Sequence, residues 1–276
     1  MSTVLVIAGK EIRDGFRNRW VLAATALLAT LALTLALLGS TPTGAVKVSP
    51  LVVTVVSLSS LTIFIVPLIA LLLSYDAIVG EIDRGTMALL LAYPVSRGEV
   101  VIGKFLGHLA ILAIATTIGY GVAGLALVIV GGGHDPAAAR AFAAMIGTSV
   151  MLGSVFIAIG YLVSAVVRER STAGGIAIGI WLFFVIIYDM ALLGILVADQ
   201  GRFLTADRLS WALLLNPADA YRLANLAGFS NVAMFSGMAG AGAQAHVGLP
   251  LLIGVLVGWT ALPLALATAI FSRRQL

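Results

Sequence analysis

The chain has 276 residues, of which 61% are hydrophobic and only 10% are charged. A soluble globular domain carries about 25% charged residues, so this composition excludes a water-soluble protein and predicts a polytopic membrane protein. The net charge of +4 comes from basic residues at the ends of apolar segments, so we expect no nucleic-acid partner. The absence of cysteine excludes disulfides, thiolate metal sites and a thiol nucleophile.

Six apolar stretches are long enough to cross the roughly 30 Å hydrocarbon core of a membrane as helices. In chain order they are Val21–Leu38, Leu51–Leu73, Phe105–Val130, Ala141–Val167, Thr172–Ala198 and Leu249–Phe271. The predicted fold class is therefore an all-α polytopic membrane protein with six transmembrane helices, forming one transmembrane domain over residues 1–276. An even number of spans places both termini on the same side.

Lysine and arginine predict which side that is, because cytoplasmic loops carry an excess of both. With the N-terminus inside, eleven basic residues face the cytoplasm and five face outward. We therefore expect both termini in the cytoplasm. No A-x-A site follows the first stretch, which favours a retained span over a cleaved signal peptide.

Residues 1–20 predict an amphipathic helix before the first span. Leu5, Ile12, Phe16 and Trp20 recur at helical spacing, and charged residues occupy the opposite face. Such a helix lies in the membrane interface. Two interpretations stay open: a basic anchor that only fixes the topology, or an elbow helix that couples the bundle to something below it.

The cytoplasmic segment Ser74–Lys104 predicts a docking surface for a protein partner. It combines the short apolar run Met87–Tyr93, too short to cross a membrane, with a break at Pro94 and a cluster of charges. The charged residues are Asp76, Glu81, Asp83 and Arg84. Exposed apolar and charged side chains together are typical of an interaction site, although a solvated connecting loop remains the alternative.

The sequence contains no convincing nucleotide-binding or catalytic motif. Residues 98–104 match G-x-x-x-x-G-K, but Phe105 stands where a P-loop needs Ser or Thr to hold Mg²⁺. We therefore expect this chain not to be an enzyme, to carry no cofactor, and to leave any ATP and Mg²⁺ to a partner subunit. Met234, Met238 and His246 are the best copper-ligand candidates, but packing is their expected use and no metal site is predicted.

The outer connection, residues 199–247, predicts two short helices. Asn216 suits the N-cap of the second helix, Pro217 its first position and Asp219 its positively polarised first turn. Asp219 and Arg222 are spaced to form an i, i+3 pair. We expect these helices to dip into the bundle or to lie on the outer interface, and the glycine-rich stretch Gly237–Gly242 to be flexible.

Asp189 is the only acidic residue well inside a predicted span. A carboxylate at that depth is costly and suggests a function, such as binding a cation or carrying a proton. The alternative is a structural pair with an outer arginine, for which the candidates are Arg202, Arg208 and Arg222. The G-x-x-x-G pairs Gly103/Gly107, Gly175/Gly179 and Gly254/Gly258 allow close helix contacts within one bundle or between two copies.

The chain resembles the membrane subunits of exporter-type ABC transporters, and among them the Nos-type permeases of nitrous oxide reductase maturation. The stretches that carry the resemblance are KEIRDGFRNRW, LIALLLSYDAIVGE, GTMALLLAYPVSRG, LLLNPADAYRLANLAGF and AIFSRR. The resemblance implies an elbow helix at Lys10–Trp20, a coupling region at Asp76–Lys104 and short re-entrant helices at Leu209–Phe229.

For partners, the resemblance implies a homodimer in the bacterial inner membrane with two copies of a separate cytoplasmic ATPase and a periplasmic copper-protein partner. The complex would help to assemble the copper centres of nitrous oxide reductase. The expected ATPase-coupling contacts are Asp76, Glu81, Asp83, Arg84, Gly85, Thr86, Arg168, Glu169 and Arg170. The expected periplasmic contacts are Trp211, Asn216, Asp219, Tyr221 and Arg222. The alternatives are an ion- or proton-coupled transporter or channel that uses Asp189, and a passive membrane scaffold.

Overall fold

The computed structural model describes residues 2–17, 19–38, 50–131, 136–199, 205–226 and 248–275. Throughout these ranges the regular secondary structure is helical, without a strand. The predictions for Gly237–Gly242 and for Met234, Met238 and His246 lie outside the described residues.

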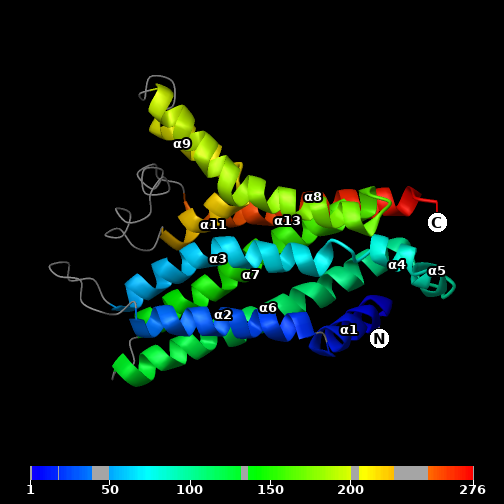
Figure 1. The fold of residues 1–276 in the computed structure, drawn as a ribbon, viewed down its shortest axis with the longest axis horizontal. Coiled ribbons are helices and arrows are strands. Elements are labelled where there is room, and N and C mark those ends of the chain that lie inside the picture. Colours follow the sequence, from blue (N-terminus) through cyan, green and yellow to red (C-terminus); the bar gives the residue numbers. More distant parts are fainter. Residues whose placement is uncertain are drawn as a thin grey trace.

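The helices run mostly side by side in one elongated bundle (Figure 1). They are α1 (Thr3–Arg17), α2 (Arg19–Leu38), α3 (Pro50–Ser74), α4 (Val79–Asp83), α5 (Thr86–Leu91), α6 (Arg97–Gly131), α7 (Pro136–Val166), α8 (Arg170–Leu182), the π-helical η1 (Phe183–Ile187), α9 (Tyr188–Asp199), α10 (Ala206–Leu214), α11 (Pro217–Leu226) and α13 (Leu249–Arg273).

Each of the six predicted spans coincides with a helix or a helix series in the structure. Among the described residues, five helices are long and apolar enough to cross a membrane, and the bent pair α1–α2 supplies a sixth when it is counted as one span. The all-helical polytopic fold is thus confirmed. The clearest difference is at α6, which begins at Arg97, eight residues before the predicted span. The extra turns carry Lys104, which proves central to the site described below.

Both termini lie at the same end of the bundle, beside α4 and α5, whereas α9 extends away at the opposite end (Figure 1). This arrangement agrees with an even number of crossings. We call the end with the termini the inner end and the other the outer end, following the orientation that the basic residues predict.

The core is centred on α7, which packs against α3, α6 and α13. Its largest fully buried side chains include Tyr120, Phe156, Tyr161 and Phe271. Among the five helices that are long enough to span a membrane singly, Arg170–Asp199 and Leu249–Arg273 are the least buried within the chain. Their apolar outward faces suit contact with lipid or with a second copy.

Helix α1 packs on the inner half of α6 through the Gly103/Gly107 pair. A Cβ atom at Gly103 would meet Ile7 Cβ at 2.9 Å, and one at Gly107 would meet Glu11 Cβ at 2.5 Å. The two glycines thus allow a backbone approach that side chains would prevent. The Gly175/Gly179 and Gly254/Gly258 pairs, by contrast, face open space within the described chain.

The fifth span is interrupted by η1, one turn of π-helix between α8 and α9. Figure 1 shows α9 leaving the bundle beyond this point. A continuous helix is what the uniformly apolar sequence predicts, so the interruption is a difference from the prediction. π-Helical turns inside α-helices shift the hydrogen-bond register and occur frequently at functional sites.

Candidate functional site

The inner end presents a short helical segment, residues 75–96, that we call the coupling segment. It begins where α3 breaks after Ser74, and the hydroxyl of Ser164 in α7 accepts hydrogen bonds from the backbone amides of Ile78 and Val79, each at 3.0 Å. These bonds satisfy two of the donors that a helix start leaves unpaired. The segment is therefore fixed to α7 by its first turn.

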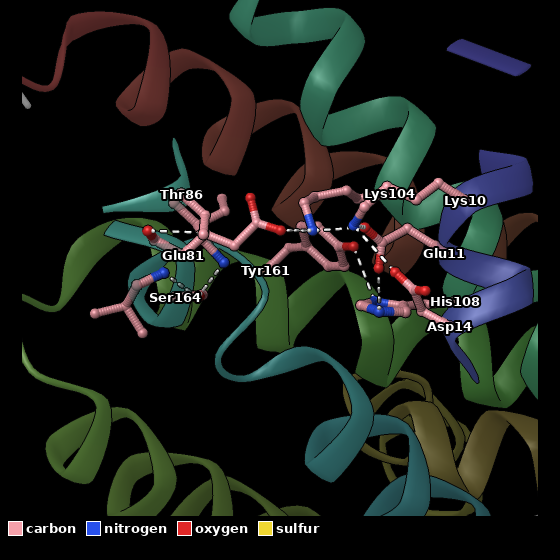
Figure 2. Close-up of polar contacts among 11 residues, drawn as sticks. Lys10, Glu11, Asp14, Glu81, Thr86, Lys104, His108, Tyr161 and Ser164 are labelled. Atoms are coloured by element: carbon pink, nitrogen blue, oxygen red, sulfur yellow. Dashed lines mark hydrogen bonds and ion pairs between the residues drawn. The ribbon is translucent and has the colours of Figure 1, made fainter. Parts of the chain in front are cut away.

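A buried ion-pair network fixes the same segment to α6 and α1 (Figure 2). Lys104 of α6 places Nζ 2.7 Å from Glu81 Oε1 and 2.8 Å from Glu11 Oε1, and only 4% of its side chain is exposed. Glu81 belongs to α4 and Glu11 to α1, so one ammonium group joins three helices. A buried lysine needs such pairing because an isolated buried charge is strongly destabilising.

His108 extends the network by one turn of α6. Its Nε2 lies 3.5 Å from Glu11 Oε2, and its Nδ1 shares a hydrogen bond of 2.9 Å with the hydroxyl of Tyr161 in α7. Burial alone would raise the pKa of Glu11, but the hydrogen bond from His108 and the charge of Lys104 lower it well below the ordinary value. Glu11 is therefore ionised at neutral pH.

The predicted ATPase-coupling residues divide into two groups in the structure. Glu81 points into the ion-pair network with 12% of its side chain exposed, and Asp76 is 22% exposed and pairs with Arg170 at 2.9 Å. The remaining members lie at the surface: Asp83, Arg84, Gly85, Thr86, Arg168, Glu169 and Arg170. A partner at this end would therefore contact the surface group, with Glu81 behind it.

The surface of the coupling segment is also apolar. The side chains of Leu89 and Tyr93 are 69% and 70% exposed. Gly85 precedes α5 with φ of 72°, a left-handed conformation that suits glycine and sets the angle between α4 and α5. The predicted short apolar helix is thus present as α5, and its outer face offers large apolar side chains to a partner.

At the inner end, two arginines donate hydrogen bonds to backbone carbonyls at the C-termini of helices. Arg97 donates from Nη1 to the carbonyl of Phe271 at 2.9 Å and also to the carbonyl of Arg274. Arg274 in turn donates to the carbonyl of Ala165 at 3.0 Å, near the end of α7. Cations here satisfy carbonyls that helix ends leave unpaired. The start of α6 and the ends of α7 and α13 are thereby tied together.

The outer end holds a second charged cluster, centred on Arg222 of α11. Its guanidinium lies 3.1 Å from Asp189 Oδ2 and 2.8 Å from Asp219 Oδ1. The predicted i, i+3 pair with Asp219 is confirmed, and so is the pairing of Asp189 with an outer arginine. Two carboxylates thus face one guanidinium, and Asp189 Oδ1 is buried without a hydrogen-bond partner among the described residues.

Asn216 and Tyr188 attach the two outer helices to the π-helical turn. Asn216 caps α11 as predicted, accepting from the amide of Ala218 at 3.0 Å, and its Nδ2 donates to Asp219 Oδ2 and to the carbonyl of Phe184 in η1, both at 2.9 Å. The hydroxyl of Tyr188 donates to the carbonyl of Ala212 at 2.6 Å. We call these contacts, with Arg222–Asp189, the outer latch.

The predicted periplasmic contacts also divide into two groups. Asn216, Asp219 and Tyr221 are fully buried, and the hydroxyl of Tyr221 shares a hydrogen bond of 3.0 Å with Ser149 in α7. Trp211, by contrast, is 66% exposed on α10. The buried residues hold α10 and α11 in the bundle, and Trp211 is the member of the set available to a partner.

Asp219 predicts a pH dependence of stability. Burial raises its pKa from 3.8 to about 8, and Asp189 adds to the rise while Arg222 opposes it. Between these two pKa values the folded chain keeps a proton that the unfolded chain releases, so the free energy of unfolding falls as pH rises, and levels off above pH 8. Thermal unfolding of Asp219→Asn should show a flatter pH profile over this window. A profile as steep as the wild type would contradict the assignment, and Asp83→Asn, at an exposed site, is the control.

Sequence reasoning missed Glu11, Lys104 and His108 as members of one site. Lys104 contributed to the predicted orientation, to the end of the predicted docking segment and to the rejected P-loop match, and Glu11 was included only in the stretch KEIRDGFRNRW. A signal was present, because Lys104 and His108 are four residues apart and so share one face of α6. Within the described ranges, no group of three or more His, Cys, Asp and Glu side chains is arranged to hold a metal ion.

Comparison with known proteins extends over the whole chain. The family model described as ABC-2 family transporter protein matches residues 5–276. The chain is 45% identical over 275 residues to "Probable ABC transporter permease protein NosY" of Stutzerimonas stutzeri, covering 99% of both chains. It is 47% identical over 277 residues to the protein of the same name from Pseudomonas aeruginosa, covering 100% of both. The matched regions therefore span the coupling segment and both charged clusters.

Proposed function

The chain belongs to the ABC-2 family of transporter proteins and is a membrane permease subunit of an ABC transporter; from this premise we propose that a separate cytoplasmic ATPase docks on its coupling segment. The observation that carries the proposal is the exposed apolar face of Leu89 and Tyr93, held against the bundle by the buried Glu81–Lys104 pair. The chain itself lacks a P-loop, so ATP and Mg²⁺ belong to the partner.

We further propose that the complex serves the assembly of the copper centres of nitrous oxide reductase. Support comes from full-length similarity to two permeases named NosY and from the Nos-type stretches in the sequence. In this proposal two copies form a homodimer in the bacterial inner membrane, with both termini in the cytoplasm. A periplasmic copper protein contacts the outer end near Trp211.

The transporter that uses Asp189 for ion or proton coupling is less well supported. Both terminal nitrogens of Arg222 lie 3.1 Å from Asp189 Oδ2. Two charge-assisted hydrogen bonds to the same carboxylate oxygen hold Asp189 in a structural ion pair. The pairing accounts for an intramembrane carboxylate without a transported ion, so we assign Asp189 to the outer latch.

A reciprocal pair of variants tests the proposal by gentle purification from native membranes and mass analysis of the proteins recovered. Leu89→Asp should lose the ATPase and keep the periplasmic partner. Truncating a central contact costs about 2 kcal/mol or more, which is roughly 30-fold in affinity. Trp211→Ala should keep the ATPase and lose the periplasmic partner. Each variant is therefore the control for the other. Recovery of the folded wild-type chain alone, or of the ATPase with Leu89→Asp, would contradict the proposal.

A further inference from the structure

The structure places Glu81 behind the docking surface, and its partner is the lysine that also binds the N-terminal helix. We propose that Lys104 is a positioning residue that fastens the coupling segment to a unit made of α1 and the inner half of α6. A movement of the coupling segment is then passed to that unit as a whole. This inference rests on the proposed function, because it takes an ATPase as the source of the movement.

The unit of α1 and α6 exists independently of the coupling segment. Gly103 and Gly107 bring the two helices into backbone contact, so that Cβ atoms there would lie 3.0 and 3.1 Å from the carbonyl oxygens of Val4 and Ala8. Glu11 lies on the same face and pairs with Lys104 at 2.8 Å. Helix α1 has its main contacts with α6. A displacement of α6 at Lys104 therefore carries α1 with it.

Besides the Ser96–Glu99 contact at its junction with α6, two further polar contacts of the coupling segment lead to other helices. Ser164 holds its first turn to α7, and Arg170 holds Asp76 from α8. The Arg170 side chain is 53% exposed, and exposed ion pairs contribute about 1 kcal/mol or less. The Lys104–Glu81 pair is the buried charged contact that leads to α6 and α1.

The charges of the network show which member can be removed without loss of the fold. One ammonium group is shared by two carboxylates, so Lys104→Met would leave the buried Glu81 without its cation, and would leave Glu11 with His108 and the largely exposed Lys10. Glu81→Gln leaves Lys104 and Glu11 as a balanced pair, with His108 still beside Glu11. The glutamine variant therefore removes the buried ion pair between the coupling segment and α6, while the α1–α6 unit stays intact.

The experiment measures distances within the chain in the intact complex with its ATPase. The chain has no cysteine, so spin labels can be placed at single engineered cysteines without removing native ones. One pair, Val6 on α1 and Leu266 on α13, reports the α1–α6 unit; a second pair, Leu91 on α5 and Leu266, reports the coupling segment. Labelled chains are diluted with unlabelled ones, so that each distance is measured within one chain.

In the wild type, both distances should change when a non-hydrolysable ATP analogue is added. In Glu81→Gln, the ATPase should still be recovered and the α5 distance should still change, but the α1 distance should stay at its nucleotide-free value. Asp83→Asn is the matched control, since it removes the same charge from an exposed position of the same helix and should behave as the wild type. Glu81→Asp keeps the charge but shortens the reach to Lys104, so it should also reduce the α1 change.

The failures are distinguishable. A wild-type chain recovered without an ATPase would overturn the proposed function and this inference with it. An ATPase recovered with Glu81→Gln, together with an undiminished α1 change, would overturn the inference alone. A Glu81→Gln chain that unfolds in detergent at the same temperature as the wild type, yet has lost the α1 change, would support positioning over general stabilisation.

Discussion

Replacing Arg222 by methionine is expected to lower the free energy of unfolding by about 3 kcal/mol. The guanidinium lies between Asp189 and Asp219, so its loss leaves Asp189 without a cation and removes a hydrogen-bond donor from the buried Asp219. Removing one partner of a buried ion pair typically costs about 3–5 kcal/mol, and the 27% exposure of Asp189 places this case at the lower end.

Denaturant unfolding in detergent measures the effect, and Arg84→Met, which removes a surface arginine at the inner end, is the control. The double variant Asp189→Asn/Arg222→Met should recover part of the loss, because a neutral amide then replaces the carboxylate that lost its cation. A double variant that is less stable than Arg222→Met would show that the two side chains do not form one electrostatic cluster.

The second large effect is expected from Gly107→Ala at the α1–α6 contact. The new Cβ would lie 2.5 Å from Glu11 Cβ and 3.1 Å from the carbonyl oxygen of Ala8, so α1 has to move away from α6. Overpacking of this kind costs about 1–3 kcal/mol. The displacement of α1 also increases the distance between Glu11 and Lys104, and so weakens the ion-pair network at the inner end.

A cysteine at Ile7, a position that is 6% exposed in the contact, measures the displacement through its rate of thiol labelling. The rate should rise in Gly107→Ala and stay low in Gly121→Ala, since a Cβ at Gly121 of the same helix meets open space. Equal labelling in the two variants would mean that the glycine pair does not set the α1–α6 approach.

Local patterns predicted the local parts of the structure. Apolar length alone located the spans, and the N-cap at Asn216 and the pair Asp219–Arg222 followed from spacings of two and three residues. Such features depend on helix geometry, which a sequence specifies directly. The same holds for α5, because its apolar run is too short to cross a membrane.

The inner network could not be predicted in the same way. Lys104 and Glu11 are 93 residues apart in the sequence, and they meet only because Gly103 and Gly107 let α1 approach α6. The π-helical turn likewise leaves no mark in the uniformly apolar stretch Phe183–Ile187, since its carbonyl at Phe184 is satisfied by Asn216 from a separate helix. Both features are products of tertiary packing.

The order of synthesis gives the Glu11–Lys104 contact a further consequence. Glu11 leaves the ribosome long before its counter-charge, because two predicted crossings are synthesised between Glu11 and Lys104. Until then the carboxylate is solvated at the membrane surface, since a buried carboxylate without a cation is too costly. The N-terminal helix is thus the first part of the chain to be translated and among the later parts to dock. Helix α1 can dock on α6 at the inner end only after α6 has been inserted.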